Sequence, residues 1–196
     1  DPSTPVEETL RVLDDLVAQG KILYPAVSNW AAWQIAKGLG ISALHGWTGF
    51  YCLQPMYSLV KRQAEVEILP LAQGEGLGVI TYSPLGGGLL TGKYAPGREA
   101  ADGRLNVHEM HTQRYAAARS EGTPERFGEY ARAQGVHPVT LAVAWAKAHP
   151  AVTAPILGAR NLEQLEPALA AGDYEMSAEV RQALNAQGYP DVDHIE

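Results

Sequence analysis

The stretch GVITYSPLGGGLLTGK, residues 78–93, decides how this chain folds and where it offers a binding surface. A short apolar run of β type reaches Tyr82 and stops at Pro84, and three glycines and Lys93 follow. A buried strand that opens into a glycine-rich loop is typical of sites for phosphate and planar rings. Glycines let backbone N–H groups approach an anion, Lys93 adds positive charge, and Tyr82 offers a stacking face. Taken alone, the stretch fits a mobile glycine-rich loop after an ordinary strand equally well.

Outside this stretch, short apolar runs alternate with helical periodicity along the whole chain. The apolar runs predict strands at 22–27, 50–53, 79–82 and 153–157, and the periodic segments predict helices at 5–20, 30–39, 65–75, 124–134, 138–149, 161–169 and 177–187, with a loop at 86–112. Buried strands separated by helices predict an α/β fold with a parallel sheet covered by helices. The polar and glycine-rich clusters follow the strands, where such folds bind their ligands.

Composition and charge limit the possible functions. The chain has 196 residues, of which 46% are hydrophobic and 19% charged, and its net charge of −7 argues against a nucleic-acid partner. There is no membrane-length apolar run and no basic-then-apolar leader, so we expect a cytoplasmic protein with no membrane partner. Its one cysteine, Cys52, excludes an internal disulfide and a cysteine-based zinc site. His108 and His111 are a weak metal pair, and we predict no bound metal.

In order along the chain, the motifs after the strands resemble the C-terminal half of an aldo-keto reductase, in the branch that includes the potassium-channel β-subunits. The similarity rests on four strings: TPVEETLRVLDDLVAQGKI (4–22), VSNW (27–30), LQPMYSLVKRQAEVEILPLAQGEGLGVITYSPLGGGLLTGKY (53–94) and PILGARNLEQLEPAL (155–169). The resemblance implies a TIM (β/α)8 barrel, of which residues 1–188 supply about half, strands 5–8, with 189–196 as a tail.

The resemblance also implies a nicotinamide cofactor, NADP(H), and assigns residues to its two ends. At the ring end, Ser28, Asn29 and Gln54 would hydrogen-bond the carboxamide, and Tyr82 would lie against the ring. Two other interpretations stay open at this point: Ser28 and Asn29 are also suitable as a helix cap, and Tyr82 as a core aromatic at a strand end.

At the phosphate end, the resemblance assigns the loop after the third strand and the start of a late helix. The pyrophosphate would lie in the loop of Ser83, Pro84, Leu85, Gly86 and Gly87, with Lys93 nearby and Arg104 as a clamp. Arg104 is equally well explained as a solvated surface residue. The 2′-phosphate of the adenosine would lie between Gly158, Arg160 and Gln164 at a helix N-terminus, where anions are favoured. An arginine at this point favours NADP over NAD.

This chain departs from the family in two places that bear on the cofactor. Ala26 stands where a glycine is usual, and Pro167 and Ala168 replace an acidic residue and an asparagine that hold the adenine. Neither replacement can hydrogen-bond adenine through its side chain, so we expect weaker adenine binding.

The catalytic Asp, Tyr, Lys and His of the family lie in the first four barrel units, so no catalytic residue is assigned in this chain. The resemblance thus implies that the intact protein transfers hydride between NADP(H) and a small aldehyde or ketone. We expect the chain alone to hold the cofactor-binding half and to be inactive. Two alternatives remain: a non-catalytic half-barrel that self-associates or pairs with a complementary N-terminal half, and a truncated gene product.

Overall fold

A parallel β-sheet forms the centre of the molecule. The computed structural model describes residues 3–94, 106 and 109–187. In this part of the chain, four strands lie in the order β1-β2-β3-β4, and each is parallel to its neighbours. They are β1 (Ala26–Ser28), β2 (Cys52–Gln54), β3 (Gly78–Thr81) and β4 (Ala154–Pro155). The α/β fold with parallel strands predicted from the sequence is confirmed.

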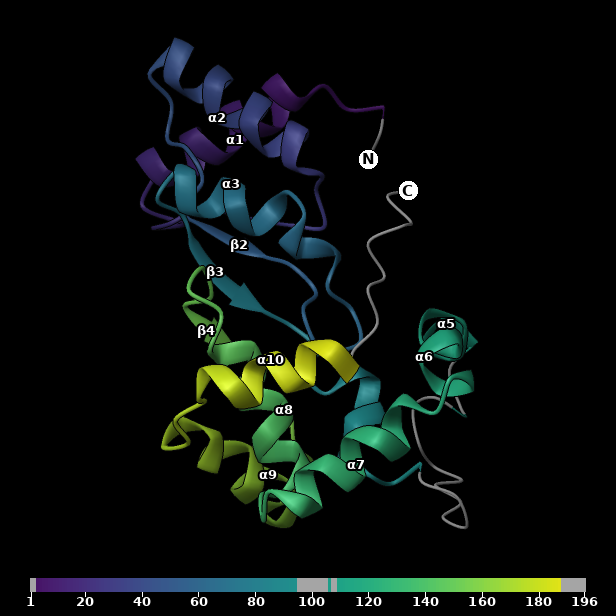
Figure 1. Cartoon of the computed structure of the whole chain (residues 1–196). Coiled ribbons are helices and arrows are strands. Elements are labelled where there is room, and N and C mark those ends of the chain that lie inside the picture. The colour runs from purple at the N-terminus through teal and green to yellow at the C-terminus, as the bar shows by residue number, and fades with distance from the viewer. Residues whose placement is uncertain (1–2, 95–105, 107–108, 188–196) are drawn as a thin grey trace.

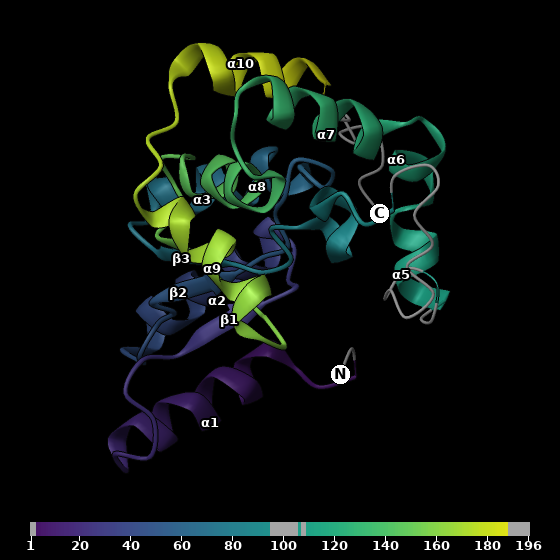
Figure 2. The same cartoon turned by 90° about the horizontal axis from the view of Figure 1, so that it is seen from below.

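Helices supply the crossovers that parallel strands require. They are α1 (Val6–Ala18), α2 (Ala32–His45), α3 (Ile68–Gly74), α5 (Glu109–Arg114), α6 (Ala116–Ser120), α7 (Thr123–Ala133), α8 (Pro138–Lys147), α9 (Leu162–Leu169) and α10 (Ala178–Gln187), with 3₁₀ turns η1 (Gln63–Glu65), η2 (Gly86–Thr91) and η3 (Ala170–Gly172). Figure 1 shows α1, α2 and α3 at one end of the sheet and α7 to α10 at the other. Figure 2 shows the same molecule from below, with α10 running along its outer side.

The sheet buries one face against the helices. Val27, Leu53 and Val79, one from each of the first three strands, are at most 8% exposed and belong to one apolar core with side chains of α1, α2, α3 and α8. Their neighbours in the strands point to the opposite face, where Ser28 is exposed and Gln54 half-buried. Side chains of successive strand residues alternate between the two faces of a sheet. The face that carries Ser28 and Gln54 is therefore less covered by helices than the face that carries Val27 and Leu53.

Several element boundaries differ from those predicted. The helix predicted at 30–39 begins at Ala32, runs to His45 and ends at Gly46 in the left-handed conformation (φ 67°). The helix predicted at 65–75 is divided into η1 and α3, and Pro70 lies in the first turn of α3, where the N–H that proline lacks is not needed. The predicted strand residues Ile22 to Pro25 precede β1, although the Pro25 carbonyl oxygen still accepts from the Tyr51 N–H at 2.9 Å.

The segment predicted as a loop at 86–112 contains helical structure in its described parts. Residues 86–91 form η2, with fully buried Leu89 and Leu90, so the glycine-rich stretch is anchored to the core rather than being an open loop. α5 begins at Glu109. No helix in the described residues is long and apolar enough to cross a membrane.

Candidate cofactor-binding site

The carboxyl ends of the strands bring the predicted ring-end residues together. Ser28 and Gln54 are register partners at the ends of β1 and β2, and the Ser28 hydroxyl donates to the Gln54 carbonyl oxygen at 2.8 Å. Tyr82 comes directly after β3, and its backbone N–H donates to the Pro55 carbonyl oxygen at 3.0 Å. Three chain segments that are distant in sequence therefore end at one level of the sheet.

Asn29 and Tyr82 contact each other across this end of the sheet. The Tyr82 hydroxyl donates to Asn29 Oδ1 at 2.8 Å, and Asn29 has a left-handed backbone (φ 58°), which asparagine adopts more readily than most residues. The cap interpretation of Ser28 and Asn29 is wrong, because the N-cap of α2 is Ala31. The core interpretation of Tyr82 is wrong too, because its side chain is half-buried and lies outside the hydrophobic core.

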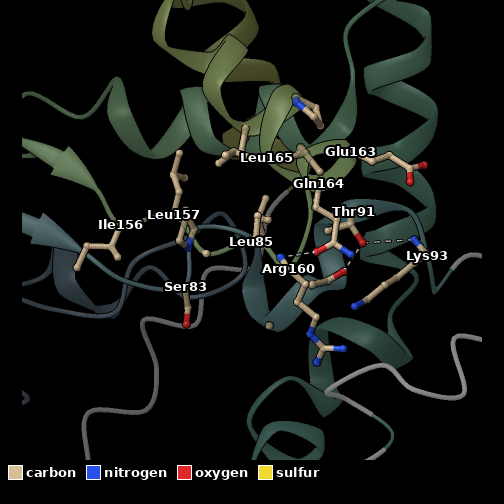
Figure 3. Close-up of a pocket in the computed structure, with 18 of the residues that line it drawn as sticks. Ser83, Leu85, Thr91, Lys93, Ile156, Leu157, Arg160, Glu163, Gln164 and Leu165 are labelled. Atoms are coloured by element: carbon tan, nitrogen blue, oxygen red, sulfur yellow. Dashed lines mark hydrogen bonds between the residues drawn. The ribbon is translucent and has the colours of Figure 1, made fainter.

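A cavity of about 790 Å³ lies beside Tyr82, between the loop after β3, the loop after β4 and α9. Most of the predicted phosphate-end residues line it: Ser83, Pro84, Leu85, Gly87, Lys93, Gly158, Arg160 and Gln164. Figure 3 shows Thr91, Lys93, Arg160 and Gln164 toward one side of the cavity and Ser83, Ile156 and Leu157 toward the other. The cationic groups are therefore concentrated at the end that is remote from the strands.

The loop after β3 has backbone conformations that favour glycine. Ser83, Gly87 and Gly88 have φ values of 58°, 65° and 98°, and the turn is joined by a hydrogen bond from the Gly86 N–H to the Ser83 carbonyl. Gly86 is buried and does not line the cavity. A Cβ at this position would lie 2.5 Å from Val60 Cγ2, so no larger residue fits there. Gly86 thus allows close packing on the core, while Gly87 and Gly88 face the cavity.

The N-terminus of α9 presents side-chain donors to the same cavity. The Asn161 side chain caps the helix by accepting from the Gln164 N–H at 3.0 Å. Gln164 Oε1 accepts from the Arg160 N–H at 3.2 Å, which leaves the Gln164 side-chain NH₂ as the donor end of that amide. Together with the Arg160 guanidinium, these groups suit an anion.

A second, smaller cavity of about 190 Å³ lies at the ring end. Asn29, Gln54 and Tyr82 line it together with apolar side chains, and Tyr82 lines both cavities. Ser28 lines neither cavity but is bonded to Gln54, and Arg104 lies outside the described residues. Tyr82 therefore lies between the larger cavity, which Lys93 and Arg160 line, and the smaller cavity, which Asn29 and Gln54 line.

Some lining residues were not predicted from the sequence. Thr91, His137, Glu163 and Leu165 also line the larger cavity, as do Pro167 and Ala168, the two departures from the family pattern. Glu163 could have been predicted as a lining residue, because it lies in the first turn of the helix whose N-terminus the resemblance assigned to the cofactor. His137 has no such signal in the sequence, because its place depends on how α8 packs; it is the N-cap of α8, and its Nδ1 accepts from the Val139 N–H at 3.2 Å.

Two further reactive groups, Cys52 and Tyr115, are poorly suited to catalysis. Burial raises the pKa of the half-buried Cys52 thiol, so this thiol stays protonated near neutral pH. Burial also raises the pKa of the Tyr115 hydroxyl, with Arg114 opposing the shift. Within the part of the chain that the structure describes, no three His, Cys, Asp or Glu side chains come together as a metal site.

The chain as a whole matches a known protein class. The family model described as "Aldo/keto reductase family" matches residues 1–187, and the chain belongs to that family, whose members are oxidoreductases that typically use NAD(P)H. The resemblance found in the sequence motifs is confirmed.

Among its relatives is the "Uncharacterized oxidoreductase YrpG" of Bacillus subtilis, which is 34% identical over 188 residues, covering 94% of this chain and 55% of the relative. A "Probable voltage-gated potassium channel subunit beta" of Oryza sativa is 34% identical over 168 residues, covering 84% of this chain and 51% of the relative. The "Aflatoxin B1 aldehyde reductase member 4" of Homo sapiens is also 34% identical, over 194 residues, with coverage of 88% and 57%. This chain spans about half the length of these curated relatives.

Proposed function

We propose that this chain is the cofactor-binding part of an NADP(H)-dependent aldo-keto reductase that acts on small aldehydes or ketones. The observation that carries the proposal is the 790 Å³ cavity, which Arg160 and Lys93 line and which adjoins the Asn29 and Tyr82 pair at the carboxyl ends of the strands. A cavity of this size is within the range of small-molecule sites, and its place is the one where α/β folds bind ligands.

The residues present fit a nicotinamide dinucleotide phosphate. Arg160 and Lys93 supply positive charge for phosphates, and Gly87 and Gly88 leave space for backbone to approach them. The adenine face can pack against the apolar side chains of Leu165, Pro167 and Ala168. Because apolar contact then takes the place of side-chain hydrogen bonds to adenine, this lining supports the expectation of weaker adenine binding. When bound, the cofactor supplies the hydride, while the protein orients the ring and the phosphates.

We propose that the proton donor of the reaction lies outside this chain. Tyr24 and Tyr51 precede β1 and β2, so they lie at the opposite end of the sheet from the cavity, where their rings contact each other. The Tyr57 hydroxyl is bound to Glu65, and Tyr94 is only 8% exposed. These placements support the assignment of no catalytic residue within 1–188.

Fluorescence and activity measurements test this function together. NADPH added to the purified chain should quench tryptophan emission saturably, because Trp30 lines the small cavity beside Asn29. The same chain mixed with NADPH and an aromatic aldehyde should show no loss of absorbance at 340 nm. The absence of saturable quenching up to millimolar NADPH would contradict the binding function, and turnover by the chain alone would contradict the absence of a proton donor.

A second candidate function follows from the exposed face of the sheet. Ala26 and Ser28 of β1 are exposed, and Leu23, Tyr24 and Tyr51 nearby are 73%, 71% and 54% exposed. An uncovered sheet face with apolar side chains at its edge favours association with a second copy or a complementary half-barrel. Sedimentation velocity distinguishes the cases: a monomer at tens of micromolar would contradict self-association.

We also propose a cytoplasmic location, in which Cys52 stays reduced.

A further inference from the structure

We propose that His137 donates a hydrogen bond from Nε2 to an acceptor atom of the nucleotide base, and that the base end of the larger cavity does not recognise the 6-amino group of adenine. The base end is the part of the cavity that Leu165, Pro167 and Ala168 line. The resemblance assigned no role to His137, and it assigned base binding to side chains that this chain lacks. The inference deepens the proposed function and rests on it, because it concerns the same cavity.

Contacts between α8 and α9 place His137 beside the base end. His137 is the N-cap of α8 and lines the cavity, as do Pro167 and Ala168. Thr140, three residues further along α8, donates from its hydroxyl to the Pro167 carbonyl oxygen at 2.6 Å. Val139 and Ala168 belong to one small apolar cluster. The start of α8 therefore packs against the part of α9 that lines the base end.

A hydrogen bond to the backbone determines which nitrogen of His137 can donate. Its Nδ1 accepts from the Val139 N–H at 3.2 Å, and only an unprotonated nitrogen can accept. In the neutral imidazole the hydrogen is then on Nε2, which is a donor. The side chain is exposed rather than packed in the core, so a ligand in the cavity can reach this donor.

The other described residues at the base end supply no side-chain acceptor for an amino group. They are apolar: Leu85, Val139, Leu165, Pro167 and Ala168. Glu163 is the one carboxylate that the described residues bring to the cavity, but it lies in the first turn of α9, three residues after Arg160. Figure 3 shows Glu163 toward the side of the cavity where Lys93 lies, which is the phosphate end.

This distribution of donors and acceptors suits a 6-oxo purine at least as well as adenine. The 6-amino group of adenine is a donor, and it meets no side-chain acceptor at the base end. The 6-oxo group of hypoxanthine is an acceptor, and N7 is an acceptor in both bases. The His137 donor can therefore serve either base, and no side chain penalises the loss of the amino group.

A base analogue of the cofactor tests what the base end recognises. Nicotinamide hypoxanthine dinucleotide phosphate, in its reduced form, has an oxo group in place of the 6-amino group of NADPH. In calorimetric titrations of the purified chain, it should bind at least as tightly as NADPH. His137→Ser retains a side chain that caps helices but removes the imidazole, and it should weaken both ligands by about fivefold, the effect of one neutral hydrogen bond.

His149→Ser is the matched control. His149 Nδ1 also accepts a backbone N–H, that of Ala151 at 3.1 Å, but His149 does not line the cavity. This variant should leave the affinities for NADPH and for the hypoxanthine analogue unchanged.

Fragments of the cofactor distinguish a contact with the base from a contact with phosphate. In nitrogen NMR spectra of the imidazole groups, millimolar adenosine should shift the Nε2 signal of His137, and inorganic pyrophosphate should not. A shift with pyrophosphate alone, tenfold weaker binding of the hypoxanthine analogue, or unchanged NADPH affinity in His137→Ser would overturn the inference. If the wild type binds neither NADPH nor adenosine 2′,5′-bisphosphate, the proposed function itself fails.

Discussion

The Tyr57 hydroxyl donates a hydrogen bond of 2.5 Å to Glu65 Oε1, and the Arg62 guanidinium binds the other oxygen of the same carboxylate at 2.7 Å. Burial alone would raise the pKa of Glu65, but the Arg62 and Tyr57 hydrogen bonds outweigh it and hold that pKa below its ordinary value. Burial and the Glu65 contact raise the pKa of Tyr57. This network joins the segment that follows β2 to η1.

Glu65→Gln should therefore destabilise the fold by about 1–3 kcal/mol at pH 7, because it removes a charge-assisted pair that is mostly shielded from water. The folded-state pKa of Glu65 is lowered, so its contribution is present above the unfolded pKa and is lost as pH falls through the folded one. Urea unfolding should show the gap between wild type and variant narrowing from pH 6 toward pH 3. Exposed Glu67→Gln is the control, and a gap that is constant with pH would contradict the account.

His149 gives a second pH dependence of stability that begins at higher pH than that of Glu65. Burial and the nearby Arg181 lower its pKa, against an opposing effect of Glu65, and its Nδ1 accepts from the Ala151 N–H at 3.1 Å, as only the neutral ring can. The unfolded state then binds the proton more readily, so stability is lost as pH falls below about 6.5. His149→Asn should lose less stability than wild type between pH 7 and pH 5, whereas exposed His45→Asn should behave like wild type.

The fold was largely predictable because its signals are local. Apolar runs at 50–53 and 79–82 coincide with β2 and β3 to within two residues, and the helix predicted at 161–169 coincides with α9 to within one residue. The C-terminus of α2 was misplaced although a local signal was present: the helix ends at Gly46, whose left-handed conformation is a common helix C-cap. The division of the segment 65–75 into η1 and α3 is a boundary of another kind, because it depends on how Ala64 and Leu69 pack in the core.

The site was predictable to a smaller extent. The resemblance gave the residue types around the strand ends, and the structure brings most of them to two adjoining cavities. The hydrogen bond between Asn29 and Tyr82, like the entry of His137 into the lining, connects elements far apart in sequence. Contacts of that kind depend on the register of the sheet and the packing of helices, so motif spacing does not reveal them.

Arg160 should determine the preference for the phosphorylated cofactor. Arg160→Gln removes a charge from the cavity wall and should weaken NADPH by about tenfold to a hundredfold, the effect of a hydrogen bond to a charged group, with little effect on NADH. Lys37→Ala is the control, because Lys37 is an exposed residue of α2 that does not line the cavity. This variant removes one positive charge and should leave the affinities for NADPH and NADH unchanged. Equal weakening of NADPH and NADH by Arg160→Gln would contradict the assignment.

Gly88 tests the placement of Lys93. A Cβ at Gly88 would lie 2.9 Å from Lys93 Nζ and Cε, and its φ of 98° strains any L-residue, so Gly88→Ala should displace Lys93. We expect NADPH affinity to fall by about threefold to tenfold and stability by about 1–2 kcal/mol. The matched control is Gly40→Ala inside α2, where a Cβ meets nothing within 4 Å; it should stabilise the protein by about 0.5–1 kcal/mol and leave NADPH affinity unchanged.

The most direct test of the central claim is isothermal titration calorimetry of the purified chain with NADPH and, in parallel, NADH. Our account predicts saturable binding of one NADPH per chain with a Kd below about 1 mM, and an affinity for NADH about tenfold weaker or more, because we propose that Arg160 binds the phosphate that NADH lacks. No saturable heat up to millimolar NADPH, or equal affinities for the two cofactors, would contradict it.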